Sequence, residues 1–174
     1  MLLLLAIKEI NAQDKYFTRE GSISFYSDAI VEDIKAVNSQ VLSIVDLTTG
    51  KIAIQIKMRS FEFEKGLMKE HFNENYVASY KYPKATFSGK ILHIESLSSN
   101  NLKTEVVGKI KLHGKEKELR TAVVIKRDAN KIIVKGVFNL KLADFDIKIP
   151  KILFKNIAEQ VAISFELHHK PYIP

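Results

Sequence analysis

Apolar and polar residues alternate along most of the chain from residue 51 onward. Over residues 51–59 the apolar face carries Ile52, Ile54 and Ile56, while lysine, glutamine and arginine lie between them. Successive side chains of a β-strand point to opposite faces, so a period of two predicts a strand with one buried and one solvated face. The same alternation recurs in three later segments, namely residues 105–112, 132–139 and 161–168.

Shorter runs of the same kind predict further strands, and the residues between runs have turn chemistry. These runs cover residues 23–26, 41–47, 85–94 and 119–125. The separators include Thr48-Thr49-Gly50 and His113-Gly114-Lys115, which favour tight turns. Short connections imply hairpins and therefore antiparallel neighbours. Seven to nine such strands, each with one apolar face, either close on themselves or stack as two sheets.

Two segments break the alternation. Between residues 63 and 76 the apolar positions recur at helical spacing, which predicts a short helix near residues 64–73. Residues 143–155 are irregular and contain Pro150, and we expect them to cross one end of the barrel.

Composition excludes several classes of protein. The chain of 174 residues carries a formal charge of +7, is 46% hydrophobic and has no cysteine. Disulfide scaffolds, cysteine-ligated metals and thiol nucleophiles are therefore ruled out. Basic residues alternate with apolar and acidic ones, as around Lys115 and Glu116, which favours solvated strand faces over a nucleic-acid surface. We expect no nucleic-acid partner.

The amino-terminal residues 1–13 differ from the rest. Met1-Leu2-Leu3-Leu4-Leu5-Ala6-Ile7 is apolar but too short to span a bilayer, which takes about 20 residues. Residues 1–13 fit a truncated signal peptide or a disordered amino terminus, and residues 14–174 form a single predicted barrel domain. The first alternative predicts a periplasmic or otherwise exported protein, and the second allows a cytoplasmic one.

Several sequence pieces together resemble the YceI-like, or polyisoprenoid-binding, family. The central pieces are Leu67-Met68-Lys69-Glu70-His71-Phe72-Asn73 and Lys81-Tyr82-Pro83-Lys84-Ala85-Thr86-Phe87-Ser88-Gly89. Three others follow the family's order: Ser22-Ile23-Ser24-Phe25, Gly108-Lys109-Ile110-Lys111-Leu112-His113-Gly114, and Phe138-Asn139-Leu140 with Asp144-Phe145. The resemblance covers roughly residues 16–168. The chain departs from the family pattern around Asp144-Phe145 and over residues 28–38, which indicates a divergent subgroup.

The resemblance implies an all-β fold, an antiparallel eight-stranded lipocalin-like barrel, usually exported to the periplasm, around an elongated cavity for an isoprenoid. A barrel of this size holds either its own side chains or one small ligand, and alternation alone does not separate these cases. Glycines on the inward face, such as Gly89, Gly108 and Gly136, either leave room for a ligand or relieve strain at barrel corners. The predicted lining is Phe25, Ile54, Ile56, Met58, Phe87, Ile91, Ile110, Val134, Phe138, Ile163 and Phe165.

Two histidines are candidates for contact with a ligand head group. His71 lies in the predicted helix, and His93 continues the apolar face of residues 85–94, so that we expect an interior position near a barrel end. The adjacent pair His168 and His169 near the carboxyl terminus is expected to be solvated. We predict no metal ligands, because adjacent strand residues point to opposite faces and do not chelate one ion.

No catalytic motif occurs, so the sequence predicts a non-enzymatic protein without a cofactor. The expected function is binding of a long-chain apolar or amphiphilic lipid, of the polyisoprenoid or isoprenoid-quinone type, as a carrier, storage or sensing protein. The alternative is a structural or interaction protein with a self-filled barrel and a basic surface for an acidic partner. Peripheral membrane contact and a homodimer are both compatible with this sequence.

Overall fold

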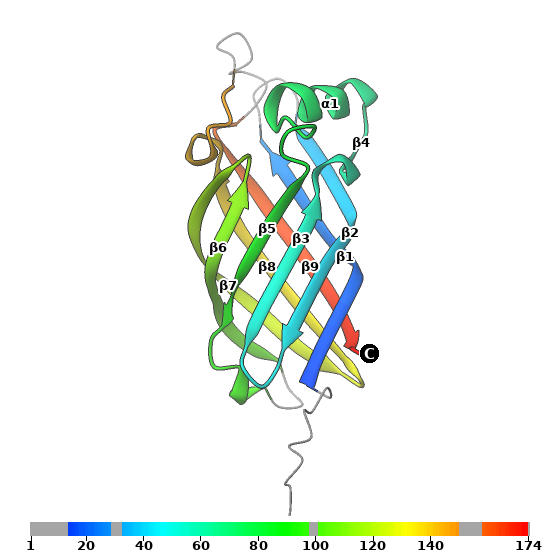
Figure 1. Ribbon diagram of the computed structural model, residues 1–174, viewed down its shortest axis with the longest axis vertical. Helices are drawn as coiled ribbons and strands as arrows, with labels where there is room; N and C mark the ends of the chain where they lie inside the picture. The colour runs from blue at the N-terminus through cyan, green and yellow to red at the C-terminus, as the bar shows by residue number, and fades with distance from the viewer. Residues whose placement is uncertain (1–13, 29–32, 98–100, 150–157, 174) are drawn as a thin grey trace, which may run out of the picture.

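The strands follow the alternation of the sequence and run obliquely around one central axis (Figure 1). The computed structural model describes residues 14–28, 33–97, 101–149 and 158–173, and the predicted leader at residues 1–13 lies outside them. The strands are β1 (Lys15–Ser27), β2 (Ile34–Asp46), β3 (Lys51–Lys57), β4 (Glu62–Phe63), β5 (Lys84–Ile91), β6 (Leu102–Leu112), β7 (Lys115–Asp128), β8 (Lys131–Lys141) and β9 (Gln160–Pro171). The helical segments are η2 (Met58–Ser60), α1 (Gly66–His71), η3 (Phe72–Tyr76), η4 (Ile94–Ser96) and η5 (Leu142–Phe145).

The sheet closes on itself. Around the barrel the order is β1, β9, β8, β7, β6, β5, β3, β2, and β2 then pairs with β1. Every neighbouring pair is antiparallel, as the hairpin turns predict. In the part of the chain that the structure describes, eight strands therefore form the barrel, and the two-residue β4 adds only a short pairing to β2. The predicted eight-stranded barrel is confirmed.

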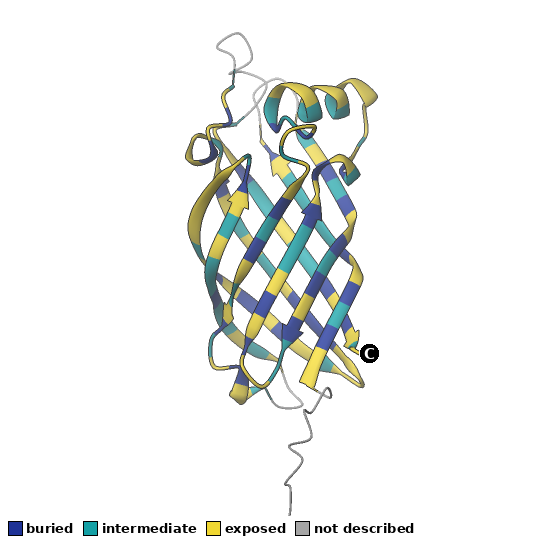
Figure 2. Ribbon diagram, in the orientation of Figure 1, coloured by how far each residue is buried: buried dark blue, intermediate teal, exposed yellow. Residues whose placement is uncertain are grey.

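Burial alternates along the strands as the period of two requires (Figure 2). Val41, Ile125 and Leu167 face inward and are almost fully buried. The intervening lysines and glutamates face water. Removing apolar surface from water contributes about 25 cal/mol per Å², so this inward face supplies the main stabilisation of the barrel.

The predicted helix is present at one end of the barrel, but it begins at residue 66 instead of 64 and its helical turns continue to residue 76 instead of 73. α1 spans Gly66–His71 and continues into one π-helical turn, η3, over Phe72–Tyr76. Just before it, the strand predicted to reach Arg59 ends at Lys57, because Met58–Ser60 turn into the 3-10 segment η2. The chain then rejoins the sheet where Phe63 pairs with Ala36. This detour places the segment from η2 to η3 across the end of the barrel (Figure 1).

The irregular segment after β8 is described only in part. η5 turns at the same end of the barrel as α1, and Asp146 ends it in a left-handed conformation (Figure 1). Residues 150–157, including the Pro150 of the predicted crossing, lie outside the described residues.

Candidate functional site

The main interior cavity lies at the α1 end of the barrel and has a volume of about 490 Å³. Its walls come from every strand of the barrel except β7, and α1, η3 and the segment after β8 border its mouth. Most lining side chains are aliphatic or aromatic, among them Ile56, Leu140 and Ile163. The volume falls within the range of about 300–1,000 Å³ that is typical of ligand pockets.

Four phenylalanines gather under α1. Phe25 of β1 stacks on Phe72 of η3, with ring centroids 5.5 Å apart and planes inclined by 22°. Phe63 approaches Phe72 at 5.1 Å and Phe25 at 5.8 Å, and Phe61 lies 5.5 Å from Phe72. Aromatic pairs at these separations contribute about 0.5–1.5 kcal/mol each beyond the burial of their area. The cluster therefore fixes the helical segment to the barrel and provides the cavity with one aromatic wall.

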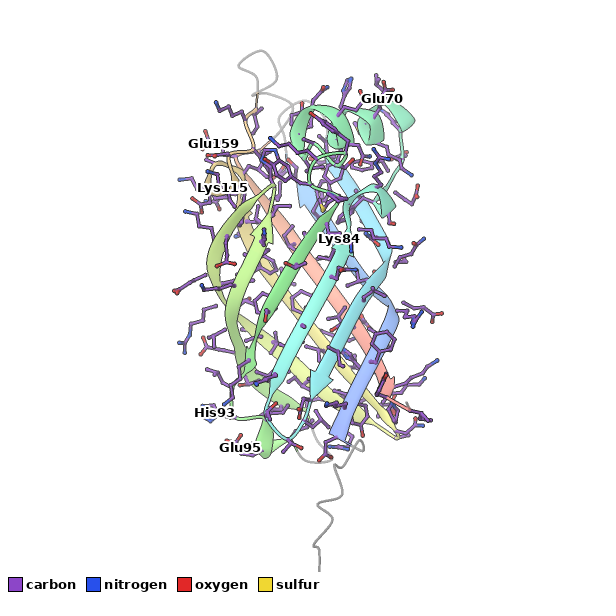
Figure 3. All side chains as sticks on the ribbon, in the orientation of Figure 1. Glu70, Lys84, His93, Glu95, Lys115 and Glu159 are labelled. Atoms are coloured by element: carbon purple, nitrogen blue, oxygen red, sulfur yellow. The ribbon has the colours of Figure 1, made fainter. Side chains whose placement is uncertain are left out.

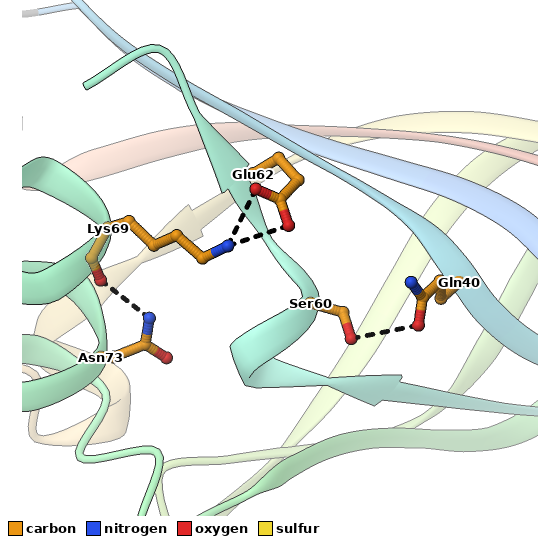
Figure 4. Close-up of polar contacts among 5 residues, drawn as sticks. All are labelled: Gln40, Ser60, Glu62, Lys69 and Asn73. Atoms are coloured by element: carbon orange, nitrogen blue, oxygen red, sulfur yellow. Dashed lines mark hydrogen bonds and ion pairs between the residues drawn. The ribbon is translucent and has the colours of Figure 1, made fainter. Parts of the chain in front are cut away.

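Polar contacts outside the cavity hold the same segment (Figure 4). Lys69 of α1 donates to both carboxylate oxygens of Glu62, at 2.9 and 2.8 Å. The side chain of Asn73 donates to the carbonyl oxygen of Lys69 at 2.7 Å, and Ser60 donates to Gln40 at 3.4 Å. Because the side chains of Lys69 and Glu62 are 36% and 72% exposed, their ion pair contributes no more than about 1 kcal/mol. The phenylalanine cluster consequently dominates the attachment of α1.

Few polar side chains line the cavity, and they lie toward its mouth. Lys65, His71 and Tyr76 come from α1 and the residues beside it. Burial raises the pKa of Tyr76 above its ordinary value, so its hydroxyl stays protonated and can donate a hydrogen bond. Ser27 is buried and accepts a hydrogen bond from the Ala158 amide at 2.9 Å. The mouth thus combines apolar walls with a small number of polar groups at one side.

A second, much smaller cavity of about 50 Å³ continues the interior toward the opposite end. Four side chains line both cavities, namely Ile23, Ile56, Ile110 and Phe138. They come from β1, β3, β6 and β8, which are alternate strands around the barrel. Inward side chains from alternate strands form a layer across a barrel. We call these four residues the floor layer.

Below the floor layer the barrel is filled by its own aromatic rings. A Cβ atom built on Gly89 or on Gly108 would lie 2.7 Å from the Phe87 ring, and one on Gly136 would lie 2.6 Å from the Phe165 ring. Gly136 therefore makes room for Phe165. Gly89 and Gly108 make room both for Phe87 and for the close approach of their own two strands, because a Cβ atom on Gly89 would overlap the Val107 carbonyl oxygen and one on Gly108 would overlap that of Ser88. The sequence left open whether the three glycines leave space for a ligand, and in the structure the chain's own phenylalanines occupy that space.

The eleven predicted lining residues divide into three groups. The main cavity is lined by Phe25, Ile56, Met58, Ile110, Phe138 and Ile163. The small cavity is lined by Ile54, Phe87, Val134 and Phe165. Ile56, Ile110 and Phe138 of the first group line it as well, because they belong to the floor layer. Ile91 lines neither cavity. It is fully buried near Gly50 in the end of the barrel that lies away from α1.

His71 and His93 lie at opposite ends of the molecule. His71 is at the cavity mouth, and its contact with a ligand head group stays a prediction. The expected interior position of His93 is wrong, because its side chain is 75% exposed and lies 3.7 Å from Glu95 at the end away from α1 (Figure 3). β5 ends at Ile91, and His93 adopts a left-handed conformation in the following turn, so the inward alternation does not reach it.

The expected solvation of the carboxyl-terminal histidine pair is wrong for one of the two. His168 is outward and half exposed, but His169 is completely buried. β9 continues to Pro171 and pairs with both β8 and β1, so the alternation carries His169 inside. Its Nδ1 lies 3.1 Å from the Ile132 carbonyl oxygen, and its Nε2 lies 2.8 Å from the Ser43 hydroxyl. Neither residue lines the two interior cavities.

Other lining residues were not predicted from the sequence. Phe61, Phe63 and Phe72 form most of the aromatic wall, and Leu142 and Ile147 border the mouth from the segment after β8. The signal in the sequence was the density of phenylalanines on either side of the predicted helix. Phe61 and Phe63 are spaced as in a strand, whereas Phe72 belongs to the helical pattern of residues 63–76, so no single period groups the three on one face.

Among the residues that the structure describes, no group of three or more histidine, aspartate and glutamate side chains is arranged to hold a metal ion. None of the helices in those same residues has the length and apolar character needed to cross a membrane.

The fold has clear relatives among solved structures. A polyisoprenoid-binding domain from Saccharophagus degradans, implicated in plant cell wall breakdown, superposes with a TM-score of 0.79 at 16% identity, covering 92% of this chain and 99% of that domain. BcnA from Burkholderia cenocepacia gives 0.73 at 18% identity, covering 85% of this chain and 95% of that one. The YCEI protein of Campylobacter jejuni gives 0.67 at 18% identity, covering 82% and 88%. No curated protein matches the chain significantly.

The closed antiparallel barrel, with its apolar cavity under a short helical segment, defines a class of lipocalin-like barrels. The YceI-like domain model matches residues 16–169, which is most of the chain. The protein therefore belongs to the YceI-like family.

Proposed function

We propose that the chain binds a long-chain apolar or amphiphilic lipid, of the polyisoprenoid or isoprenoid-quinone type, inside its barrel. The observation that carries this proposal is the apolar cavity of about 490 Å³ with an aromatic wall formed by Phe25, Phe61 and Phe72. The solved relative from Saccharophagus degradans, described as a polyisoprenoid-binding domain, supports the same ligand class.

Burial of the apolar tail would drive binding. Each Å² of tail surface removed from water contributes about 25 cal/mol before the cost of ordering the ligand. A polar head group would stay at the mouth, where His71 and Tyr76 offer hydrogen-bonding groups. Tail length and shape, more than a set of polar contacts, would then determine affinity.

The proposed role is non-catalytic, as a carrier, storage or sensing protein. The closest arrangement to a nucleophile and a base in the described residues is Ser43 with His169, which lie 2.8 Å apart. Both are buried, and neither lines an interior cavity, so a substrate has no access to the hydroxyl. The pair supports a structural role.

We also propose that the protein is exported and exchanges lipid at a membrane surface. The apolar run at residues 1–7 supports export. Leu67 and Tyr80, which are 62% and 73% exposed, lie on α1 and just after η3 and support peripheral membrane contact beside the cavity mouth. Fractionation of the native host, followed by amino-terminal sequencing of the mature chain, tests export.

Native mass spectrometry of protein purified from its host without detergent tests the lipid proposal. A stoichiometric adduct that extracts as an isoprenoid or quinone supports it and identifies the ligand class. The same spectra give the oligomeric state. An apo mass, together with no uptake of added isoprenoids, contradicts the proposal and leaves the self-filled interaction protein as the better account. Association with an acidic partner through surface lysines would then weaken steeply with salt.

A further inference from the structure

The floor layer divides the interior of the barrel into two compartments of very different size. The compartment on the α1 side measures about 490 Å³, and the one beyond the floor layer measures about 50 Å³. Three members of the layer are isoleucines, and the fourth, Phe138, is the largest. A tail entering under α1 meets this layer before it reaches the small compartment.

The layer is supported from below. The ring of Phe138 meets the ring of Phe165 edge to face, with centroids 6.4 Å apart. Phe165 in turn occupies the space beside Gly136, where a Cβ atom would lie 2.6 Å from its ring. Phe87 fills the corresponding space beside Gly89 and Gly108. It belongs to β5, which lies across the barrel from β9, the strand of Phe165. The side chains beneath the floor layer are thus packed into glycine-lined space, which leaves Phe165 little room to withdraw.

We propose that the floor layer sets the maximum length of lipid tail that the barrel encloses, with Phe138 as the residue that determines this length. The inference rests on the proposed lipid binding and specifies the tail length of the ligand. The enclosed part of the tail is a few isoprene units long, and any further units stay outside the mouth. Each unit that enters adds buried apolar surface, whereas each unit beyond the limit adds almost none.

The experiment measures affinity across all-trans isoprenoid alcohols of increasing length, from geraniol through farnesol and geranylgeraniol to longer homologues. Displacement of anilinonaphthalene sulfonate from the full chain reports binding. For the wild-type chain we expect affinity to rise by about tenfold or more per unit and then to level off, with a change below about twofold for each later unit. A rise that continues through the longest homologues overturns the proposal.

Phe138→Ala joins the two compartments, so the levelling point moves to an alcohol at least one isoprene unit longer. Phe138→Leu, which keeps aliphatic bulk and is the variant to use if the alanine variant does not fold, moves it in the same direction by a smaller step. Phe17→Ala is the matched control, because Phe17 packs against Tyr172 outside both cavities. A purely structural role of Phe138 lowers all affinities together and leaves the levelling point unchanged, which overturns the proposal. If no alcohol binds the wild-type chain, the proposed function itself fails, and the length limit fails with it.

Discussion

The Nε2 atom of His169 lies 2.8 Å from the Ser43 hydroxyl, inside the end of the barrel away from α1. The Ile132 carbonyl oxygen can only accept a hydrogen bond, so the Nδ1 atom of His169, 3.1 Å away, carries the ring proton. Nε2 then accepts from the Ser43 hydroxyl. The two contacts satisfy both nitrogens of a neutral imidazole.

Acid should therefore destabilise the protein through His169. Burial lowers the pKa of His169 to about 4, from 6.5 in its ordinary state. Below pH 6.5 the His169 imidazole is protonated in the unfolded chain but still neutral in the folded one. The contribution of His169 to the free energy of unfolding is therefore fully present above this pH and is lost as the pH falls toward about 4. The loss from this group is about 3 kcal/mol. Urea denaturation at a series of pH values measures it.

Two variants separate this effect from that of the surface carboxylates. Hydrogen bonds from Lys115 and Lys135 lower the pKa values of Asp146 and Glu166, so acid also weakens these pairs. His169→Gln should remove the part of the pH dependence between pH 6.5 and about 4. His168→Gln, on the outer face of the same strand, should retain it. Equal slopes in His169→Gln and the wild-type chain would exclude this histidine as the source.

Ile56→Asp should abolish lipid uptake. Ile56 is 9% exposed and belongs to the floor layer, so a carboxylate there would put a charge against the tail. Uptake of farnesol, measured by dye displacement on protein whose circular dichroism matches the wild-type chain, tests this. Ile44→Asp is the control, because Ile44 faces outward and is 37% exposed. Unchanged uptake by folded Ile56→Asp would remove Ile56 from the lining.

Phe72→Ala should loosen α1 without opening the barrel. Phe72 contacts Phe25, Phe61 and Phe63, so losing its ring costs about 2–3 kcal/mol of local stability. Amide hydrogen exchange should accelerate across Gly66–Tyr76, while the amides of β6 and β7 keep their protection.

Glu70→Ala provides the control for the same helix, because Glu70 is exposed at the molecular surface (Figure 3). Exchange in this variant should stay close to that of the wild-type chain. Uniform acceleration through the barrel strands in Phe72→Ala would show instead that the cluster supports the whole fold.

Gly136→Ala should destabilise the protein by about 1–3 kcal/mol, because the new methyl group overlaps the Phe165 ring. Phe165→Leu in the same chain should recover part of this loss, since the smaller side chain clears the overlap. The free energies of unfolding of both single variants and the double variant form a thermodynamic cycle. Gly66→Ala, where a Cβ atom meets nothing within 4 Å, should cost little. Strict additivity in the cycle would contradict the proposed fit of Phe165 against Gly136.

The strand positions and the inward faces could be read from the sequence because a period of two reflects local backbone geometry. Ile52, Ile54 and Ile56 lie on the inward face for this reason, and so do the other predicted lining residues that belong to strands. Met58 is buried although it lies beyond the end of β3. The short helix was also predictable, although its ends were not, because α1 passes directly into the π-helical turn at Phe72. Alternation failed at His93, because β5 ends at Ile91. At His169 the alternation holds, and the prediction was wrong because β9 extends further than expected.

Local patterns could identify the inward residues but could not decide which of them enclose space. That depends on how side chains from strands distant in sequence meet across the barrel. Phe165 and Phe87 fill the volume beside the glycines, while Phe25 and Phe72 pack against each other and leave a cavity beside them. The same apolar alternation is compatible with a filled or a hollow barrel. Only the closure of the sheet and the packing of its rings made one half filled and the other hollow.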